Sequence, residues 1–204
     1  KRRQHIDDKC LFKLAQDGLY LSFKAFEYYP IPHSNCCNKY IHGNFEHVDY
    51  VSANADKLRD ELKVCTPLSN RDKAILDDLK SSESVCVHIR RGDYLDPKWA
   101  QLNVCTYEYY NRAINYIAKQ RPNAVFYVFS NTPADIEWIK ANYHFDQSNI
   151  YYVTYGCPDY EEFRLMTSCK HFIISNSTFS WWAAYLGEYS DKIVVSPSCW
   201  SKTS

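Results

Sequence analysis

Glycine is scarce in this chain, with 5 residues among 204, and neither sign of charge is in excess, because 24 basic residues balance 24 acidic ones. The low glycine content excludes collagen-like and low-complexity sequences. The balanced charge excludes the broad electropositive field typical of nucleic-acid binders, so we expect no nucleic-acid partner. No apolar run approaches the ~20 residues of a membrane span, so none is expected. The basic start, Lys1-Arg2-Arg3, is not followed by the apolar stretch of a signal peptide.

Several short chemical motifs are also missing. The sequence has no G-x-x-x-x-G-K loop, which argues against ATP or GTP hydrolysis, and no G-x-G-x-x-G. It has no Asp-x-Asp pair of the kind that holds a divalent metal on a sugar diphosphate, so we expect no metal and no other cofactor. The nine cysteines form no Cys-x-x-Cys pair and their number is odd, which favours free thiols, although Cys36-Cys37 could bond elsewhere.

Aromatic residues are abundant, and from residue 85 onward the chain alternates two kinds of segment. Short runs rich in Val, Ile, Tyr and Phe predict strands; they cover residues 85–90, 125–130, 150–154, 171–175 and 192–196. Helical spacing and end signals predict the helices between them, at residues 107–120, 133–142, 160–169 and 179–187. This order predicts an α/β domain with a Rossmann-like parallel sheet covered on both faces.

The first 80 residues show no such alternation. Residues 12–14 and 19–26 resemble strands, and residues 53–64 and 70–80 resemble helices. A polar stretch at Ser81-Ser82 precedes the first strand of the regular half. We therefore expect a partial connecting region over residues 1–80 and a sheet domain over residues 81–204.

Two polar segments follow predicted strands. His88-Ile89-Arg90-Arg91-Gly92-Asp93 ends the first strand, and Ser175-Asn176-Ser177-Thr178 ends the fourth. Ligands of parallel α/β sheets bind outside the carboxyl ends of the strands, so we expect one shared crevice. The combination of cationic side chains and a helix start suits a diphosphate, and a nucleotide sugar is the expected ligand.

In the first segment, strand alternation places His88 and Arg90 on one face. Arg90 is the better candidate to bind a diphosphate, because a guanidinium matches phosphate oxygens and keeps its charge. Alternatively, Arg90 or Arg91 pairs with Asp93 to pin the loop, and an ion pair of Arg91 with Asp93 can coexist with a ligand contact of Arg90. His88 either hydrogen-bonds a ribose or base edge, or fills the end of the sheet as a satisfied polar residue.

In the second segment, residues 175–178 offer N–H groups and hydroxyls at the start of a helix, which is an anion site. Plain N-capping by Ser177 or Thr178 would give the same sequence. Phe179 belongs to the core or to the wall of a sugar pocket. Asn176 begins a glycosylation sequon, but a phosphate crevice is a poor place for a glycan.

These segments, together with Val128-Phe129-Ser130-Asn131 and the long run from Leu165 to Leu186, resemble the α-1,2-fucosyltransferases of glycosyltransferase family 11. The resemblance implies a GT-B-type architecture whose donor domain binds GDP-fucose. In that picture His88 contacts the guanosine, Arg90 the β-phosphate, and the start of the last helix the diphosphate. Glu162 stands where the family usually has an Asp that contacts the guanine edge. The expected substrate-binding residues are His88, Arg90, Arg91, Glu162, Asn176, Ser177, Thr178 and Phe179, and the expected catalytic residues are Arg90 and Asp93.

The implied reaction is the metal-independent, inverting transfer of L-fucose from GDP-β-L-fucose to the 2-hydroxyl of a galactose-terminated glycan. Asp93 and Asp96 are the local candidates for the base, with Asp93 preferred. Two alternatives stay open: an α-1,6- or O-fucosyltransferase, or a non-catalytic GDP-sugar-binding module. The glycine-rich segment with which the family begins is absent, so the chain resembles the carboxyl-terminal part of such an enzyme. A bacterial cytoplasmic enzyme of polysaccharide biosynthesis is favoured over a Golgi one.

Overall fold

The computed structural model describes residues 7–22, 27–154 and 158–202, and the chain divides into two compact units, Lys1–Lys63 and Val64–Ser204. The division comes earlier than the boundary expected near Ser81. Helix α4 (Asn70–Ser81) belongs to the second unit, because its Leu76 and Leu79 are buried in the core against the sheet.

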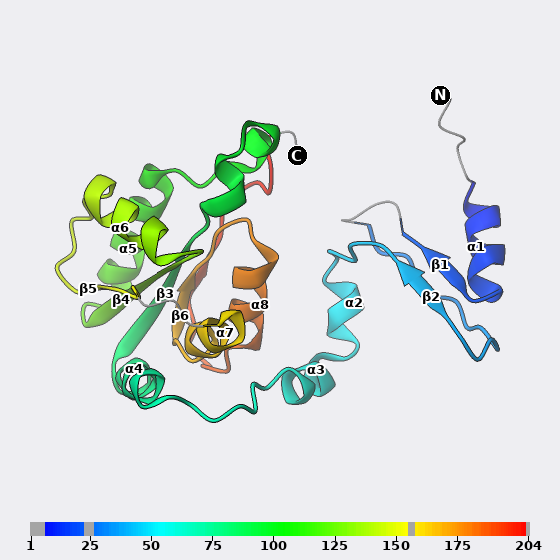
Figure 1. Ribbon diagram of the computed structural model, residues 1–204, viewed down its shortest axis with the longest axis horizontal. Helices are drawn as coiled ribbons and strands as arrows, with labels where there is room; N and C mark the ends of the chain where they lie inside the picture. The colour runs from blue at the N-terminus through cyan, green and yellow to red at the C-terminus, as the bar shows by residue number, and fades with distance from the viewer. Residues whose placement is uncertain (1–6, 23–26, 155–157, 203–204) are drawn as a thin grey trace. The chain divides into compact units, whose positions relative to one another are not determined.

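The second unit is built around five parallel strands, as the sequence predicted (Figure 1). They are β3 (Glu83–Ile89), β4 (Ala124–Ser130), β5 (Ile150–Tyr152), β6 (His171–Ile173) and β7 (Val194–Val195). Their order in the sheet is β5-β4-β3-β6-β7. The two central strands, β3 and β4, are almost entirely buried, which explains their continuous apolar sequence.

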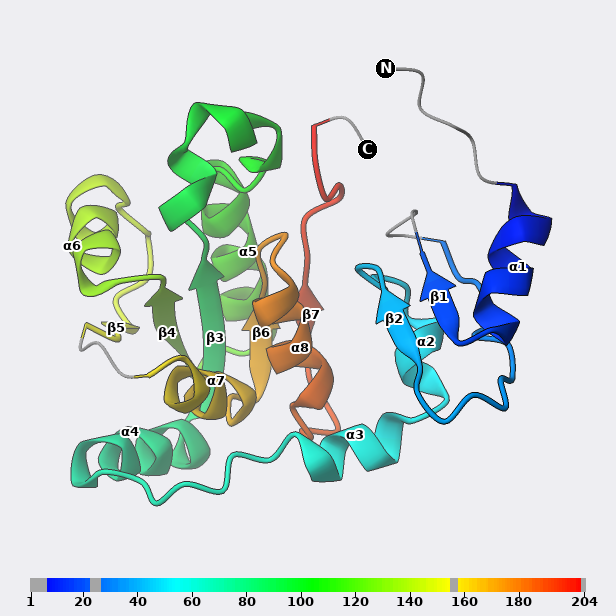
Figure 2. The ribbon, with the colours of Figure 1, turned by 45° about the vertical axis from the view of Figure 1, so that its right-hand side comes forward.

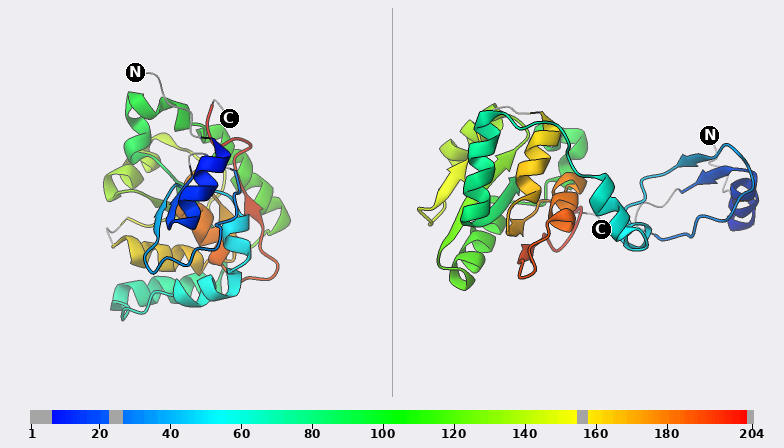
Figure 3. Two further views of the ribbon diagram at one scale, coloured as in Figure 1. Left: turned by 90° about the vertical axis from the view of Figure 1, so that its right-hand side faces the viewer. Right: turned by 90° about the horizontal axis from the view of Figure 1, so that it is seen from below.

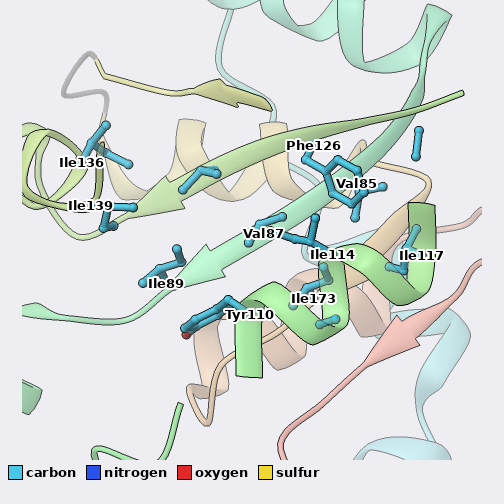
Figure 4. Packing of buried hydrophobic residues seen from close by; sticks show 13 residues of the cluster. Val85, Val87, Ile89, Tyr110, Ile114, Ile117, Phe126, Ile136, Ile139 and Ile173 are labelled. Carbon is cyan, nitrogen blue, oxygen red and sulfur yellow. The ribbon is translucent and has the colours of Figure 1, made fainter. Parts of the chain in front are cut away.

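Helices cover both faces of the sheet (Figure 2). Alternate residues of β3 divide between two clusters: Val85, Val87 and Ile89 pack against one set of helices, while Cys86 packs against the other. The first set is α5 (Tyr107–Gln120) and α6 (Pro133–Asn142), whose Ile114, Ile117, Ile136 and Ile139 fill the cluster of Figure 4. The second set is α4, α7 (Asp159–Thr167) and α8 (Thr178–Leu186).

The chain reverses its direction across the sheet between two neighbouring strands. From β3 it moves outward through β4 to β5, and it then returns to the other side of β3 to form β6 and β7. In open parallel sheets this reversal opens a crevice at the carboxyl ends of the two strands involved. Here those strands are β3 and β6, which the two polar segments follow.

Between β3 and α5 lie two 3-10 helices, Gly92–Leu95 and Pro97–Leu102, that the sequence did not predict. The turn that begins this region needs Gly92, whose φ is +40°. A side chain at that position would be strained, and its Cβ would lie 3.1 Å from the Asn131 amide.

The first unit contains α1 (Asp8–Gln16), β1 (Leu19–Leu21), β2 (Tyr40–His42), α2 (Asp49–Ser52) and α3 (Ala55–Glu61). Helix α1 packs beside β1, and β1 pairs with β2 in parallel (Figure 3). The strand expected at residues 12–14 is wrong, because Asp7 caps a helix there by accepting a 2.8 Å hydrogen bond from the Cys10 N–H. Of the strand expected at residues 19–26, residues 23–26 lie outside the described residues. No helix in the described parts of either unit is long and apolar enough to cross a membrane.

Candidate functional site at the carboxyl ends of β3 and β6

The two polar segments meet at the reversal point of the sheet, as their positions in the sequence predicted. His88 near the end of β3 and Ser175 just after β6 are both buried, and the His88 Nδ1 lies 3.0 Å from the Ser175 Oγ. A second link joins the segments, because the Tyr94 hydroxyl donates to the Asn176 carbonyl at 2.9 Å. Hydrogen bonds therefore hold the two segments together at the carboxyl ends of β3 and β6.

His88 is an uncharged member of this site. Burial, together with the smaller effect of the positive charge of Arg90, lowers the pKa of His88 to about 3. Its ring lies 6.0 Å from the Phe179 ring of α8, centroid to centroid. At neutral pH the imidazole can therefore contribute hydrogen bonds and ring contacts, but no charge.

Arg90 directly follows β3, and its side chain contacts the loop that begins there. Its Nη2 donates to the Asp93 Oδ1 at 2.7 Å, and its guanidinium carbon lies 5.5 Å from the centre of the Tyr94 ring. Its Nε is buried and has no hydrogen-bond partner among the residues that the structure describes. A buried donor without a partner is costly, so Arg90 has capacity for a further acceptor.

Arg91 points toward α6. The Arg91 Nε lies 3.3 Å from the Asp135 Oδ1, and the guanidinium carbon lies 3.3 Å from the centre of the Trp138 ring. The backbone N–H of Arg91 donates to the Asn131 Oδ1. The alternative ion pair of Arg91 with Asp93 is therefore wrong: Asp93 pairs with Arg90. The side chain of Arg91 anchors the loop. This geometry does not favour a direct contact between Arg91 and a ligand.

Asn176 has a structural place in the second segment. Its Nδ2 donates to the carbonyl oxygens of Leu102 and Trp200 at 2.8 Å and 2.7 Å, and its side chain is buried. Both amide hydrogens are thus used within the protein. The expected ligand contact of this side chain is replaced by an anchoring role, and the sequon is inaccessible in the folded unit.

Ser177, Thr178 and Phe179 form the start of α8. Ser177 is the N-cap residue, but its hydroxyl makes no capping hydrogen bond, so the plain capping alternative does not describe this residue. Thr178 is exposed, and Phe179 packs 5.3 Å from the Phe163 ring of α7. A first helical turn without a side-chain cap has N–H donors that suit an anion.

Glu162 lies on α7, the helix that packs against α8. Burial, together with the smaller effect of the charge of Asp159, raises the pKa of the Glu162 carboxyl to about 7. No hydrogen bond to its carboxyl is found among the described residues. A half-buried carboxyl group with a strongly shifted pKa is typical of a functional position.

Comparison with known proteins identifies a family and several relatives of this chain. Residues 18–204 match the family described as "Glycosyl transferase family 11". An "Alpha-1,2-colitosyltransferase" of Escherichia coli is 37% identical over 164 residues, which cover 78% of this chain and 54% of that protein. The "O-antigen biosynthesis glycosyltransferase WbnK" of Escherichia coli is 38% identical over 145 residues, covering 69% of this chain and 46% of that protein. The human "Galactoside alpha-(1,2)-fucosyltransferase 1" is 29% identical over 143 residues, covering 64% and 38%.

The chain spans about half of the length of the two bacterial relatives. Among solved structures, "Crystal structure of POFUT1 in complex with GDP" aligns with 64% of this chain and 47% of that chain, at 13% identity and a TM-score of 0.40. That score is too low to support an inference. The family match, by contrast, confirms the resemblance seen in the sequence.

Proposed function

This chain belongs to glycosyl transferase family 11, and we propose that it forms the donor-binding part of an enzyme that transfers L-fucose from GDP-β-L-fucose. The acceptor in this proposal is the 2-hydroxyl of a galactose-terminated glycan, and the product linkage is α-1,2. The observation that carries the proposal is the contact of the two polar segments at the reversal point of the sheet. The relatives named as α-1,2-fucosyl- and α-1,2-colitosyltransferases support it.

We assign the diphosphate to Arg90 and to the first turn of α8. As the bond between the sugar and the diphosphate breaks, negative charge grows on the departing β-phosphate oxygen, and a guanidinium stabilises that charge. The unpartnered Nε of Arg90 supports this role, as does the uncapped start of α8. In this proposal the chemistry needs no metal ion or other cofactor.

The acceptor hydroxyl must lose its proton as it attacks the anomeric carbon from the side opposite the diphosphate, which inverts the configuration from β to α. Asp93 is paired with Arg90 at 2.7 Å, on the side of the leaving group. This contact favours an orienting role for Asp93 over that of the base. The Asp96 side chain, the other candidate, caps the second 3-10 helix and lies 3.1 Å from the Lys98 Nζ.

Kinetics of an Asp93 variant of the complete enzyme separate these roles. Loss of a carboxylate that orients Arg90 is expected to raise the KM for GDP-fucose, whereas loss of the base is expected to lower kcat and to remove the acid limb of its pH profile. We expect the first result for Asp93→Asn. A normal KM with a large fall in kcat would assign the base to Asp93.

The donor sugar has a second candidate. The relative named as an α-1,2-colitosyltransferase is 37% identical to this chain, and colitose differs from fucose by the loss of one hydroxyl. Turnover of the complete enzyme with each GDP-sugar decides between the two, and NMR of the product determines the linkage. An α-1,6 or O-linked product would replace the α-1,2 assignment.

The direct test of the donor site is calorimetry of this chain with GDP. Saturable binding is expected, and a folded sample that binds no GDP would refute the assignment. Binding without turnover by the complete enzyme would support a non-catalytic GDP-sugar-binding module. We also propose the bacterial cytoplasm as the location, since the two relatives of higher identity are from Escherichia coli.

A further inference from the structure

A chain of buried hydroxyl groups connects His88 to the backbone of the α8 start. The Ser175 Oγ lies 3.0 Å from the His88 Nδ1 and 3.4 Å from the Ser180 Oγ. The Ser180 Oγ also lies 3.1 Å from the Ser177 carbonyl oxygen and 3.3 Å from the Ser175 carbonyl oxygen. The side chains of Ser175 and Ser180 are fully buried, so bulk water does not compete for these contacts.

The direction of each hydrogen bond follows from counting hydrogens. A carbonyl oxygen only accepts, and a serine hydroxyl has one hydrogen to donate. The nearest partner of the Ser180 hydroxyl is the Ser177 carbonyl, so Ser180 donates there and accepts from Ser175 where the contact of the two hydroxyls is a hydrogen bond. With the Ser175 hydrogen used in this way, the Ser175 Oγ accepts from the His88 Nδ1, and all three contacts are hydrogen bonds.

We infer that Ser180 and Ser175 are positioning residues that hold His88 in the tautomer with hydrogen on Nδ1, so that Nε2 meets the donor substrate as a hydrogen-bond acceptor. This inference rests on the proposed function and specifies its donor site. An acceptor at this point selects a ligand group that donates, such as a ribose hydroxyl or a base N–H. It disfavours a phosphate oxygen, which would place two acceptors against each other.

The opposite tautomer is less favourable. In it Ser175 donates to the His88 Nδ1 while Ser180 still donates to the Ser177 carbonyl. The 3.4 Å contact of the two serine hydroxyls then carries no hydrogen, so the chain has two hydrogen bonds in place of three. The pKa of His88, lowered to about 3 by burial, is consistent with a neutral ring whose one hydrogen is fixed by its neighbours.

The tautomer is measurable by NMR in the ligand-free chain at pH 7. Long-range ¹H–¹⁵N correlation spectra of the ¹⁵N-histidine-labelled protein distinguish the protonated ring nitrogen from the unprotonated one, and a His88→Gln sample identifies the resonances of His88 among the seven histidines. We expect hydrogen on Nδ1 and a lone pair on Nε2. Hydrogen on Nε2 would overturn the inference.

Ser180→Ala tests the origin of that preference. Without the Ser180 oxygen, the Ser175 hydroxyl is free to donate to the His88 Nδ1, so the opposite tautomer should become populated. If half to four-fifths of the molecules switch, GDP affinity falls about twofold to fivefold, in proportion to the fraction that remains competent. An unchanged tautomer in a folded Ser180→Ala protein would refute the role of Ser180.

Ser168→Ala is the matched control, because the Ser168 hydroxyl donates to the Arg164 carbonyl on α7 and is not part of the chain to His88. It should change neither the tautomer nor the GDP affinity. If Ser180→Ala does not fold, Ser175→Ala removes the acceptor of Nδ1 directly and should also populate the opposite tautomer. The two measurements distinguish failure of the proposed function from failure of this inference. If His88 has the predicted tautomer but the chain binds no GDP, the GDP site is refuted. If the chain binds GDP but His88 has the opposite tautomer, only this inference is refuted.

Discussion

GDP affinity should increase between pH 6 and pH 8, because the proposed guanine contact of Glu162 requires an ionised carboxylate. The guanine edge presents N–H donors, and only the carboxylate accepts from two of them. Burial and the neighbouring Asp159 raise the pKa of Glu162 to about 7. The ionised fraction in the free protein is then about a tenth at pH 6 and about nine-tenths at pH 8, so the apparent Kd should fall about tenfold.

The same carboxyl group should affect stability with a definite sign. The pKa of Glu162 in the folded protein is raised above its value of about 4.5 in the unfolded chain. The contribution of this group to the free energy of unfolding is therefore most favourable below pH 4.5, where the carboxyl is protonated in both states, and is lost as pH rises through 7. At pH 8 the ionised group lowers the free energy of unfolding by up to about 3 kcal/mol, and at pH 5 by less than about 1 kcal/mol. Glu162→Gln should therefore stabilise the chain at pH 8 far more than at pH 5.

Calorimetry at pH 6, 7 and 8 and constant ionic strength measures the affinity, and urea denaturation measures the stability. Glu162→Gln is the matched control, because it keeps the shape of the side chain and removes the titration. The terminal phosphate of GDP also titrates near pH 6, so the ratio of wild-type to variant affinity isolates Glu162. A ratio that is the same at all three pH values would refute the guanine contact, while a variant no more stable at pH 8 would refute the raised pKa.

Three further changes test other parts of the unit. Arg90→Ala should weaken GDP binding by about 1.5–3 kcal/mol, the range for a hydrogen bond to a charged group. Calorimetry measures the affinity, and an unchanged affinity would show that the role of Arg90 is purely structural. Asn176→Ala should lower the free energy of unfolding by about 2–4 kcal/mol, since two carbonyl oxygens lose their donors; urea denaturation measures it, and a neutral result would contradict the anchoring role. The hydrogen bond from His171 lowers the pKa of Glu83, so Glu83→Gln should destabilise the chain at pH 7. The difference in stability between variant and wild type should vanish as pH falls through the lowered pKa of Glu83. Thermal denaturation measures this difference, and an equal loss at every pH would contradict the linkage.

The sheet domain was predictable because its signals are local. Helices α5 and α6 begin and end where the sequence predicted, at residues 107–120 and 133–142. In α6 the start signal is physical: the Thr132 hydroxyl accepts from the Asp135 N–H, and Pro133 follows at a position where its missing N–H costs nothing.

The features that were predicted wrongly or missed depend on interactions that a short window of sequence does not reveal. Residues 12–14 have the composition of a strand, but the Asp7 cap commits them to a helix. The two 3-10 helices after Gly92 carry no regular apolar period. The partner of Arg91 is 44 residues away along the chain, at the first turn of α6. The protonation of Glu162 depends on burial by α7 and its neighbours, which only the folded unit provides.

The two adjacent arginines illustrate how the sheet divides structural and ligand-binding roles. Alternation along β3 sends Arg91 to the face covered by α6, where Asp135 and the Trp138 ring satisfy it, and this contact fixes the loop that begins at Gly92. Arg90 instead pairs with the exposed carboxylate of Asp93, and its buried Nε has no hydrogen-bond partner among the described residues. It therefore has a donor available for a ligand. Beside a neutral imidazole, the site would hold a diphosphate through one guanidinium and the N–H groups of α8, so its affinity should depend on hydrogen-bond geometry more than on ionic strength.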